Sequence, residues 1–275
     1  MERCYVRVVM RLKNTGRGSE VLSMYSFSFY FIIFVLTWVT SMIFAIAGVG
    51  AANTLVPIYY SLGIPFSTAA ATGLLLNVFS LSTATINNAR RGRVLWKLGT
   101  VFLIPAVVMA PIGAYVGIHT PRRVLLCVFA AFLMYTLYSL VRGKVKERSG
   151  RFYGDIRGYV LGVLVGAVVG FLGGLLGVGG GLIILPVLAL IEKDAKKVSA
   201  TAGYVALFTS ASGFASYLFL LRGVDYGLWV VVLIGGVLGG FCGSYLMNCM
   251  RTLYVKYAIV AIISFVLVKI LVGLI

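Results

Sequence analysis

Two glycine-rich stretches interrupt apolar sequence that would otherwise favour unbroken helices. One reads LGVGGGLIILP over residues 176–186, and the other reads AGVGAANTLVP over residues 47–57. Glycine adopts backbone conformations that other residues avoid, and it lets a ligand or another chain segment come close. Inside a membrane, the N–H and C=O groups that such a break leaves unpaired are costly unless something binds them. The two stretches therefore predict places where backbone N–H groups face a cavity.

The chemistry that suits such a break is anion binding, because the first N–H groups of a helix carry partial positive charge. Transporters place the N-termini of broken helices against an anionic substrate in this way. The candidate substrate-binding residues at the breaks are Gly48, Gly50, Ala51, Ala52, Asn53, Gly177, Gly179, Gly180 and Gly181. The alternative for a glycine in an apolar helix is close packing of two helices, and we expect that role for the glycines of residues 162–174.

Neutral polar side chains could complete an anion site without the desolvation cost of a full charge. Those within the apolar runs are Thr72, Asn77, Ser80, Ser82, Thr83, Asn87, Asn88, Ser199, Thr201, Thr209, Ser210 and Ser212. The alternative for each of them is hydrogen bonding between helices. Thr72 and Thr201 are selected as substrate-binding residues, because they occupy matched positions beside the two breaks. No Asp or Glu lies in the middle of an apolar run, so we expect no metal, no cofactor and no proton-relay carboxylate.

The elements that must position these residues are membrane-spanning helices. Of 275 residues, 61% are hydrophobic and 11% are charged, whereas soluble domains carry about 25% charged residues. A helix of about 20 apolar residues crosses the hydrocarbon core. The runs of that length are 25–47, 66–88, 98–118, 123–141, 157–177, 199–221, 227–247 and 254–274. Two shorter apolar pieces, 51–62 and 181–191, each follow a break and predict half-helices or re-entrant segments.

The two breaks belong to an internal repeat. At one offset of 129 positions, the stretch 47–57 aligns with 176–186, Thr72 aligns with Thr201, and Phe79 aligns with Phe208. The predicted fold is therefore an all-α polytopic membrane protein with about eight transmembrane helices in two repeated four-helix halves, each carrying one glycine break. The predicted organisation is a basic cytoplasmic tail (1–24), a first repeat (25–142), a basic cytoplasmic linker (143–156) and a second repeat (157–275).

The basic residues indicate an orientation in the cell membrane. Cytoplasmic loops of membrane proteins carry an excess of Lys and Arg. With eight spans, this pattern places both termini, the loop from Arg90 to Lys97 and the linker in the cytoplasm. The residues that then lie at outer ends, against the pattern, are Arg122, Arg123, Arg251 and Lys256. The net charge of +17 does not indicate nucleic-acid binding, because the basic residues lie in short segments between apolar runs.

The arrangement resembles the sulfite exporter TauE/SafE family of small membrane permeases. The stretches that carry the resemblance are GLLGVGGGLIILPVL (174–188), its weaker copy AIAGVGAANTLVPIY (45–59) and SATAGYVALFTSASG (199–213). The resemblance implies a transporter of small anions, with sulfur-containing oxyanions or organosulfonates such as sulfite or sulfoacetate as substrates. Its expected partners are the anionic substrate and the lipid bilayer, and a homo-oligomer is left open.

Two other function classes compete with this interpretation. A membrane thiol–disulfide protein would need paired cysteines near the membrane centre, and Cys4, Cys127, Cys242 and Cys249 form no CxxC motif. A permease for a metal ion or another small solute would want acidic, histidine or methionine ligands in the spans, and acidic ones are missing. No nucleotide-binding motif is present, so we expect neither ATP-driven transport nor an enzyme.

Overall fold

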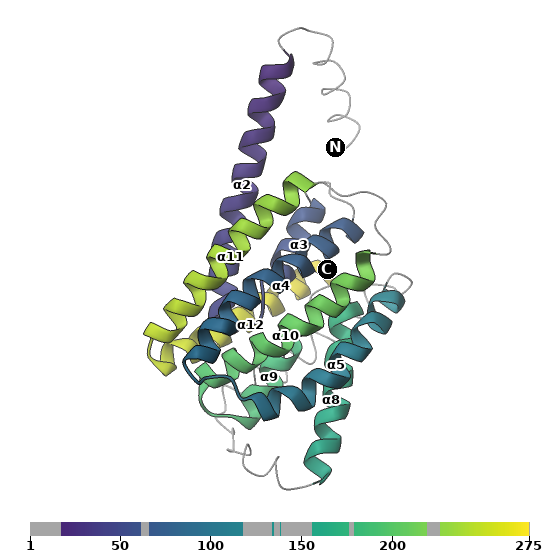
Figure 1. Cartoon of the computed structure of the whole chain (residues 1–275), viewed down its shortest axis with the longest axis vertical. Coiled ribbons are helices and arrows are strands. Elements are labelled where there is room, and N and C mark those ends of the chain that lie inside the picture. The colour runs from purple at the N-terminus through teal and green to yellow at the C-terminus, as the bar shows by residue number, and fades with distance from the viewer. Residues whose placement is uncertain are drawn as a thin grey trace.

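The computed structural model describes residues 18–61, 66–117, 134, 138, 156–175, 179–218 and 226–274, and no strand occurs among them. The helices are α2 (Gly18–Ala47), α3 (Ala52–Ser61), α4 (Phe66–Arg90), α5 (Trp96–Gly117), α8 (Ile156–Leu175), α9 (Gly181–Ile191), α10 (Ala195–Leu218), α11 (Tyr226–Cys249) and α12 (Thr252–Leu274). Their arrangement is drawn in Figure 1. Each follows one of the predicted apolar runs or short pieces, while the run at 123–141 lies outside the described residues apart from Met134 and Tyr138.

Four of these helices contain stretches that are long and apolar enough to cross a membrane. They are Tyr30–Ala47, Thr68–Arg90, Trp96–Val116 and Tyr226–Cys249. Large apolar side chains stand exposed on all four of them, such as Val108 of α5 (63% exposed) and Val230 of α11 (54% exposed). An exposed apolar surface of this kind suits lipid rather than water. The all-helical membrane architecture therefore holds, and the number of eight spans stays a prediction.

Helices α4 and α10 form an inner antiparallel pair. Gly203 of α10 lies against Leu81 of α4, and Gly213, further along α10, lies against the earlier residue Leu74. These two helices carry most of the buried neutral polar side chains, and both are less apolar than their neighbours. Their polar residues avoid lipid because α11 and α2 cover one side of the pair and α5 and α8 cover the other.

The outer helices on the first side run parallel to α4. Gly235 and Gly243 of α11 lie against α2 near Phe34 and Ala45 respectively, so α2 and α11 point the same way. The side chains of Asn87 in α4 and Ser244 in α11 are joined by a hydrogen bond of 3.0 Å. Gly236, earlier on α11, lies against Leu76, earlier on α4. Helices α2, α4 and α11 therefore all run in one direction.

The helices on the second side run the opposite way, together with α10. Just before α5, the Leu95 N–H donates to Thr201 Oγ1 at 3.0 Å. Further along both helices, the Ser212 hydroxyl donates to the Val107 carbonyl at 2.8 Å, so α5 and α10 are parallel. The backbone oxygens of Phe102, Ala106 and Ala110 in α5 pack in turn against Gly166, Gly170 and Gly174 of α8. These contacts confirm the predicted packing role for Gly166, Gly170 and Gly174, whereas Gly173 lies against Gly180 at the second break.

The helix directions correct the predicted topology. Helices α2 and α4 are parallel, so the short helix α3 between them returns the chain to the end where α2 begins. The start of α2 and the loop after Arg90 consequently lie at opposite ends of the bundle (Figure 1). The prediction that the N-terminal side and the Arg90–Lys97 loop share one side of the membrane was wrong. That prediction assumed that the runs 25–47 and 66–88 cross the membrane in opposite directions, with the piece 51–62 between them.

Candidate functional site

The first break lies between the end of α2 and the start of α3. Gly48 and Gly50 have φ angles of 69° and 79°, which other residues rarely adopt. Helix α3 begins at Ala52, whose N–H donates to Asn77 Oδ1 of α4 at 3.1 Å. The N-terminus of α3 is thus directed at a buried amide in the middle of α4. A Cβ atom on Gly50 would overlap the same amide group, so only glycine fits there.

The second break lies between α8 and α9, and its part at residues 176–178, including Gly177, is outside the described residues. Gly179 and Gly180 have φ angles of 71° and 41°. Gly180 is the N-cap of α9, and no side chain caps this helix. Ile184 N donates to the Gly180 carbonyl at 3.0 Å, so the helix is established from its first turn. Within the described part of the chain, the N-terminus of α9 therefore carries no side-chain acceptor.

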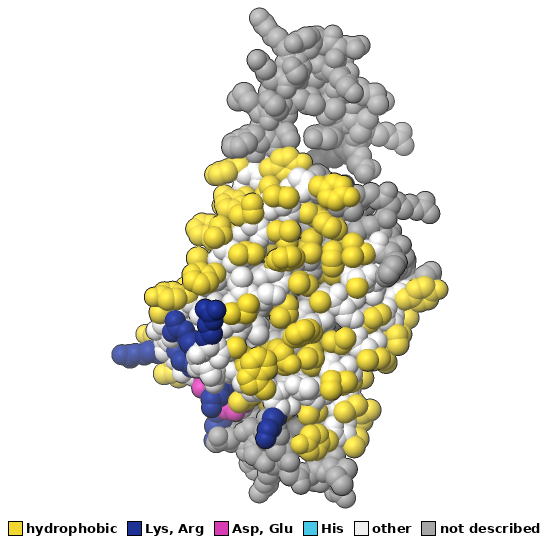
Figure 2. Space-filling model, in the orientation of Figure 1, with side chains coloured by type: hydrophobic (Ala, Val, Ile, Leu, Met, Phe, Trp, Pro, Cys, Tyr) yellow, Lys and Arg dark blue, Asp and Glu magenta, His cyan; other side chains and the backbone are white. Residues whose placement is uncertain are grey.

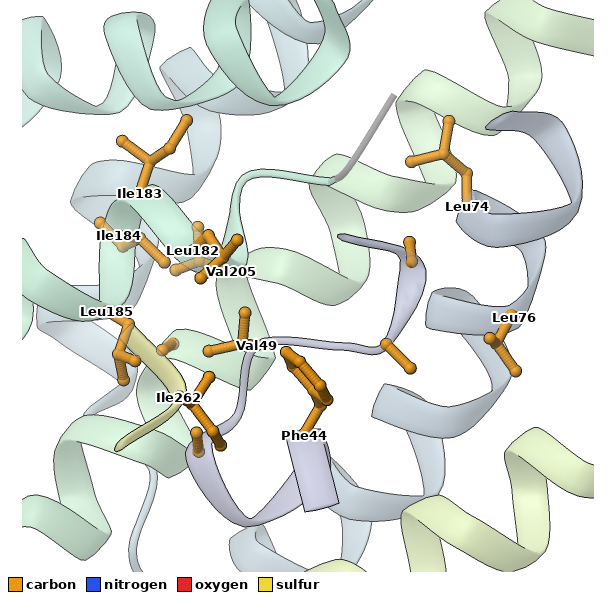
Figure 3. Close-up of a cluster of buried hydrophobic side chains, with 14 of the residues drawn as sticks. Phe44, Val49, Leu74, Leu76, Leu182, Ile183, Ile184, Leu185, Val205 and Ile262 are labelled. Carbon is orange, nitrogen blue, oxygen red and sulfur yellow. The ribbon is translucent and has the colours of Figure 1, made fainter. Parts of the chain in front are cut away.

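The two breaks meet at the centre of the bundle. Gly181 lies against the carbonyl of Val49, the residue between the two glycines of the first break. Figure 3 shows Val49 within the buried cluster that also contains Leu182 at the start of α9 and Val205 of α10. The juxtaposition connects the two halves of the chain at the positions where their helices are broken.

A polar pair from the inner helices lies between the breaks. Asn77 Nδ2 of α4 donates to Ser210 Oγ of α10 at 3.4 Å, and both residues are fully buried. A Cβ atom on Gly179 would overlap Ser210 Oγ and would lie 3.2 Å from Asn77 Nδ2. Gly50 and Gly179 thus bring both breaks against the same amide, and Gly179 also brings the second break against the Ser210 hydroxyl.

The half-helices α3 and α9 leave this centre in opposite directions. Helix α3 leads toward Phe66, where α4 begins, and α9 leads to Ala195, where α10 begins at the other end. Their N-termini therefore both face the centre. Each helix N-terminus is equivalent to about half a positive elementary charge, so together they provide about one positive charge. This arrangement can hold a small anion through backbone N–H groups, one amide and one hydroxyl.

The other predicted residues of the first break lie close to this centre. Ala51 and Ala52 are fully buried, and Asn53 follows them in the first turn of α3. Its Nδ2 atom is buried and has no acceptor within the described part of the chain. An amide donor without an acceptor beside a helix N-terminus is consistent with an anion site. The assignment of these residues to substrate binding stays a prediction.

Thr72 and Thr201 occupy equivalent places away from the contact between the breaks. The Trp229 indole N–H of α11 donates to Thr72 Oγ1 at 3.0 Å. Thr201 Oγ1 accepts the Leu95 N–H ahead of α5. Each hydroxyl thus joins an inner helix to a helix from the other half, as the alternative of interhelical hydrogen bonding predicts. Their role as substrate ligands is not tested by these contacts.

Asn77 and Ser210 were among the polar side chains noted in the sequence but were not selected as site residues. Selection by the repeat missed them, because they are not aligned with each other at the offset of 129. A usable signal existed, since Asn77 lies at the middle of the predicted run 66–88. An amide at the centre of a span is costly in lipid and often functional.

The features of the competing classes can also be located. Cys242 and Cys249 lie on α11 as free thiols, while Cys4 and Cys127 are outside the described residues. A group of three or more His, Cys, Asp or Glu side chains suited to a metal ion is not found in the described ranges. Of the acidic side chains placed by the structure, Glu192 and Asp194 lie together at one end of the bundle, between α9 and α10.

The fold and the site define a class, that of polytopic helical membrane proteins whose paired broken helices meet at a buried centre. The family model described as sulfite exporter TauE/SafE matches residues 33–270, which is most of the chain. The protein belongs to this family of membrane permeases, and its members are transporters rather than enzymes. Comparison with curated proteins and with solved structures gives no match.

Proposed function

We propose that the protein is a permease for small monovalent anions, with sulfur-containing oxyanions or organosulfonates as the substrate class. The observation that carries the proposal is the convergence of the α3 and α9 N-termini on Asn77 and Ser210. The substrate class follows from the family description, sulfite exporter. A monoanion is preferred over a dianion, because two helix termini balance about one negative charge.

The site is built to bind charge without using a charged side chain. Asn77 and Ser210 are fully buried, and a buried Lys or Arg in their place would cost much more to desolvate. Backbone and amide dipoles compensate part of the charge of an entering anion, and they leave no unpaired charge behind when it departs. Such a site can both load and release its ligand, which transport requires.

The buried position of the site implies that it opens by movement of helices. The inner pair α4 and α10 carries one polar residue of the site each, and the weak 3.4 Å contact between Asn77 and Ser210 joins them. We propose that the two halves of the chain form an inverted repeat, with α2 to α5 corresponding to α8 to α11. Inverted repeats allow alternating access by rocking one unit against the other around a fixed site.

The distribution of basic side chains indicates an orientation in the plasma membrane. The described Lys and Arg side chains gather at the end that holds the 90–97 loop, the 192–197 connection and the end of α11, where Figure 2 shows dark-blue side chains grouped at the lower left. We call this the basic end. By the positive-inside rule, the basic end faces the cytoplasm, and the start of α2 faces the outside.

The proposal is tested with Asn77→Asp in proteoliposomes, by measuring the flux of sulfite, sulfate, thiosulfate, sulfoacetate and an unrelated carboxylate. The substitution keeps the shape of the side chain and the acceptor for the Ala52 N–H, but its negative charge repels an anion. Flux of a sulfonate without a second ionisable group, such as methanesulfonate, should be lost near neutral pH and should recover as the pH falls and the new carboxyl group is protonated.

The matched control is Asn87→Asp, which adds the same charge ten residues further along α4. This variant should retain most of the flux, because Asn87 bonds to Ser244 away from the breaks. If Asn77→Asp transports as well as Asn87→Asp at equal reconstitution, the centre between the breaks is not the anion site.

A further inference from the structure

A group of basic side chains is partly buried at the basic end, away from Asn77 and Ser210. Lys196, in the first turn of α10, is only 7% exposed, and its ammonium group donates to the Asn248 carbonyl at the end of α11 at 3.0 Å. Lysine is rarely buried to this extent unless it is paired. An ammonium group has three N–H donors, and one carbonyl accepts only one of them.

Two arginines accompany this lysine. The backbone N–H groups of Arg91 and Arg93 both donate to the Asn88 backbone carbonyl, at 3.2 and 3.1 Å. These bonds fold the loop back over the end of α4. Arg93 Nε is a buried atom without an acceptor within the described ranges. The charge of Arg93 acts on Lys196 and, after burial, is the largest cause that lowers the pKa of that lysine. Arg91 lies with its guanidinium 5.7 Å from the centre of the Tyr245 ring.

The acidic residues nearby do not neutralise these cations. Asp194 Oδ1 accepts the Lys196 backbone N–H at 3.0 Å, which caps the start of α10. Glu192 Oε1 accepts the backbone N–H groups of Lys193 and Asp194 at 2.9 and 3.1 Å. One oxygen of each carboxylate thus bonds to the backbone of the connection between α9 and α10. Their charge offsets part of the field but leaves the donors of Lys196 and Arg93 unmatched.

The ends of α4 and α11, which lie beside these cations, are joined by amide hydrogen bonds. Asn248 Nδ2 donates to Asn88 Oδ1 at 2.8 Å and to the Ser244 carbonyl at the same distance. Asn248 is itself 7% exposed. This pair ties the end of α4 to the end of α11 and fixes the loop that carries the arginines. The cations are therefore held on a rigid support rather than on flexible surface side chains.

We infer that Lys196 and Arg93, with Arg91 at the rim, form a second binding site that takes a tetrahedral or pyramidal oxyanion group. Removing one or more N–H donors and a positive charge from water without an acceptor is costly, and an oxyanion supplies several acceptor atoms at once. The oxyanion belongs either to a free anion in solution or to the phosphate of an anionic lipid. The site is separate from the polar centre at Asn77, because Asn88 is eleven residues further along α4, or about 16 Å, while Gly48 at the start of the first break lies against Ser199, one turn along α10 from Lys196.

The alternative role for Lys196 is that of a helix cap. A positive charge near the last carbonyl groups of α11 stabilises that helix terminus without any ligand. The two roles differ in whether they require Arg93, whose side chain does not bond to Asn248 in the structure. A cap needs Lys196 alone, whereas an oxyanion site needs both cations.

The test measures binding rather than flux, so that it does not depend on the proposed substrate. Lys196→Gln, Arg93→Gln and the control Lys193→Gln are made in the Asn77→Asp background, which disables the central site. Lys193 is exposed on the same connection, and its removal subtracts the same charge. The shift of the unfolding temperature is measured with sulfate against chloride at equal ionic strength, and in nanodiscs with and without phosphatidylglycerol.

Sulfate or phosphatidylglycerol should stabilise the Asn77→Asp parent and the Lys193→Gln variant. Affinity should fall roughly tenfold or more in Lys196→Gln and in Arg93→Gln, since each removes a charge-assisted hydrogen bond. Loss of the sulfate response assigns the site to a free anion, and loss of the lipid response alone assigns it to a headgroup. The inference is overturned if Arg93→Gln responds to both probes as Lys193→Gln does, whether or not Lys196→Gln folds.

Discussion

Gly179→Ala should abolish anion transport while it leaves the protein folded. The substitution has two separate effects. Alanine at a φ of 71° is in the left-handed region, which costs roughly 1–2 kcal/mol for a residue with a Cβ atom. The new methyl group would also overlap Ser210 Oγ and would lie 3.1 Å from Ser210 Cβ. A serine hydroxyl can rotate away, so the fold survives, but Ser210 then loses its position beside Asn77.

Gly92→Ala is the control for the backbone effect. Gly92 has a φ of 65°, and a Cβ atom there would meet nothing within 4 Å. The two variants thus carry nearly the same backbone penalty, while only Gly179→Ala adds a methyl group to the site. Both should be less stable than the wild type by about 1–2 kcal/mol, visible as a small decrease in the unfolding temperature in detergent.

The assay is the uptake of radiolabelled sulfite into proteoliposomes that contain equal amounts of folded protein. Gly92→Ala should transport at close to the wild-type rate, and Gly179→Ala should transport at the rate of empty vesicles. Should both variants transport equally, the contact between Gly179 and Ser210 would be a matter of packing alone. A Gly179→Ala protein that fails to insert would instead show that the overlap cannot be relieved by rotating one hydroxyl.

Three further outcomes follow from the structure. A cysteine that replaces Lys193, in a protein whose native cysteines are replaced by serine, should resist an impermeant thiol reagent added to intact cells, and ready labelling would place the basic end outside. Gly170→Leu should reduce stability strongly, because a Cβ atom there already overlaps the Ala106 carbonyl of α5, and an unchanged unfolding temperature would contradict the close packing of α5 and α8. The pKa of Lys196 is lowered from its usual value of 10.5, so the native state binds fewer protons than the unfolded state between the two pKa values. Stability should therefore rise with pH in that interval, and Lys196→Gln should remove this rise in chloride-only buffer, which unfolding measurements at several pH values would check.

Much of the secondary structure could be predicted, because in a membrane the length of an apolar run fixes the length of a helix. The predicted piece 181–191 coincides with α9, and the run 66–88 falls within α4, which continues to Arg90. The glycine–valine–glycine pattern correctly located the positive φ angles at Gly48, Gly50 and Gly179. These features are local, since they depend on chain length and on which residues tolerate unusual backbone conformations.

The partners across the bundle could not be predicted in the same way. Asn77 and Ser210 are 133 positions apart, and the periodicity of an inner helix does not tell which of its polar faces meets which. The sequence offered hydrogen bonding between helices and substrate binding as alternatives for all such side chains. In the structure the hydroxyls of Thr72 and Thr201 bond to the other half of the chain, whereas Asn77 and Ser210 lie between the breaks, and substrate binding stays a prediction for all four.

The error in topology has a single physical origin, the length of the half-helices. A helix of ten or eleven residues is about 16 Å long, close to half of the roughly 30 Å of a hydrocarbon core. Such a piece has no inherent direction, because it can continue a crossing or return from its middle. The direction of this piece determines the side of the membrane on which all later loops lie. The positive-inside rule can therefore be applied only after that direction is known. With α3 and α9 both returning, Lys193, Arg251 and the Arg90–Lys97 loop share one end, and Arg251 no longer opposes the rule. In the proposed mechanism the two glycine breaks therefore have two effects, because the turn that directs the helix N-termini at the centre also reverses the direction of the chain, as the proposed inverted repeat requires.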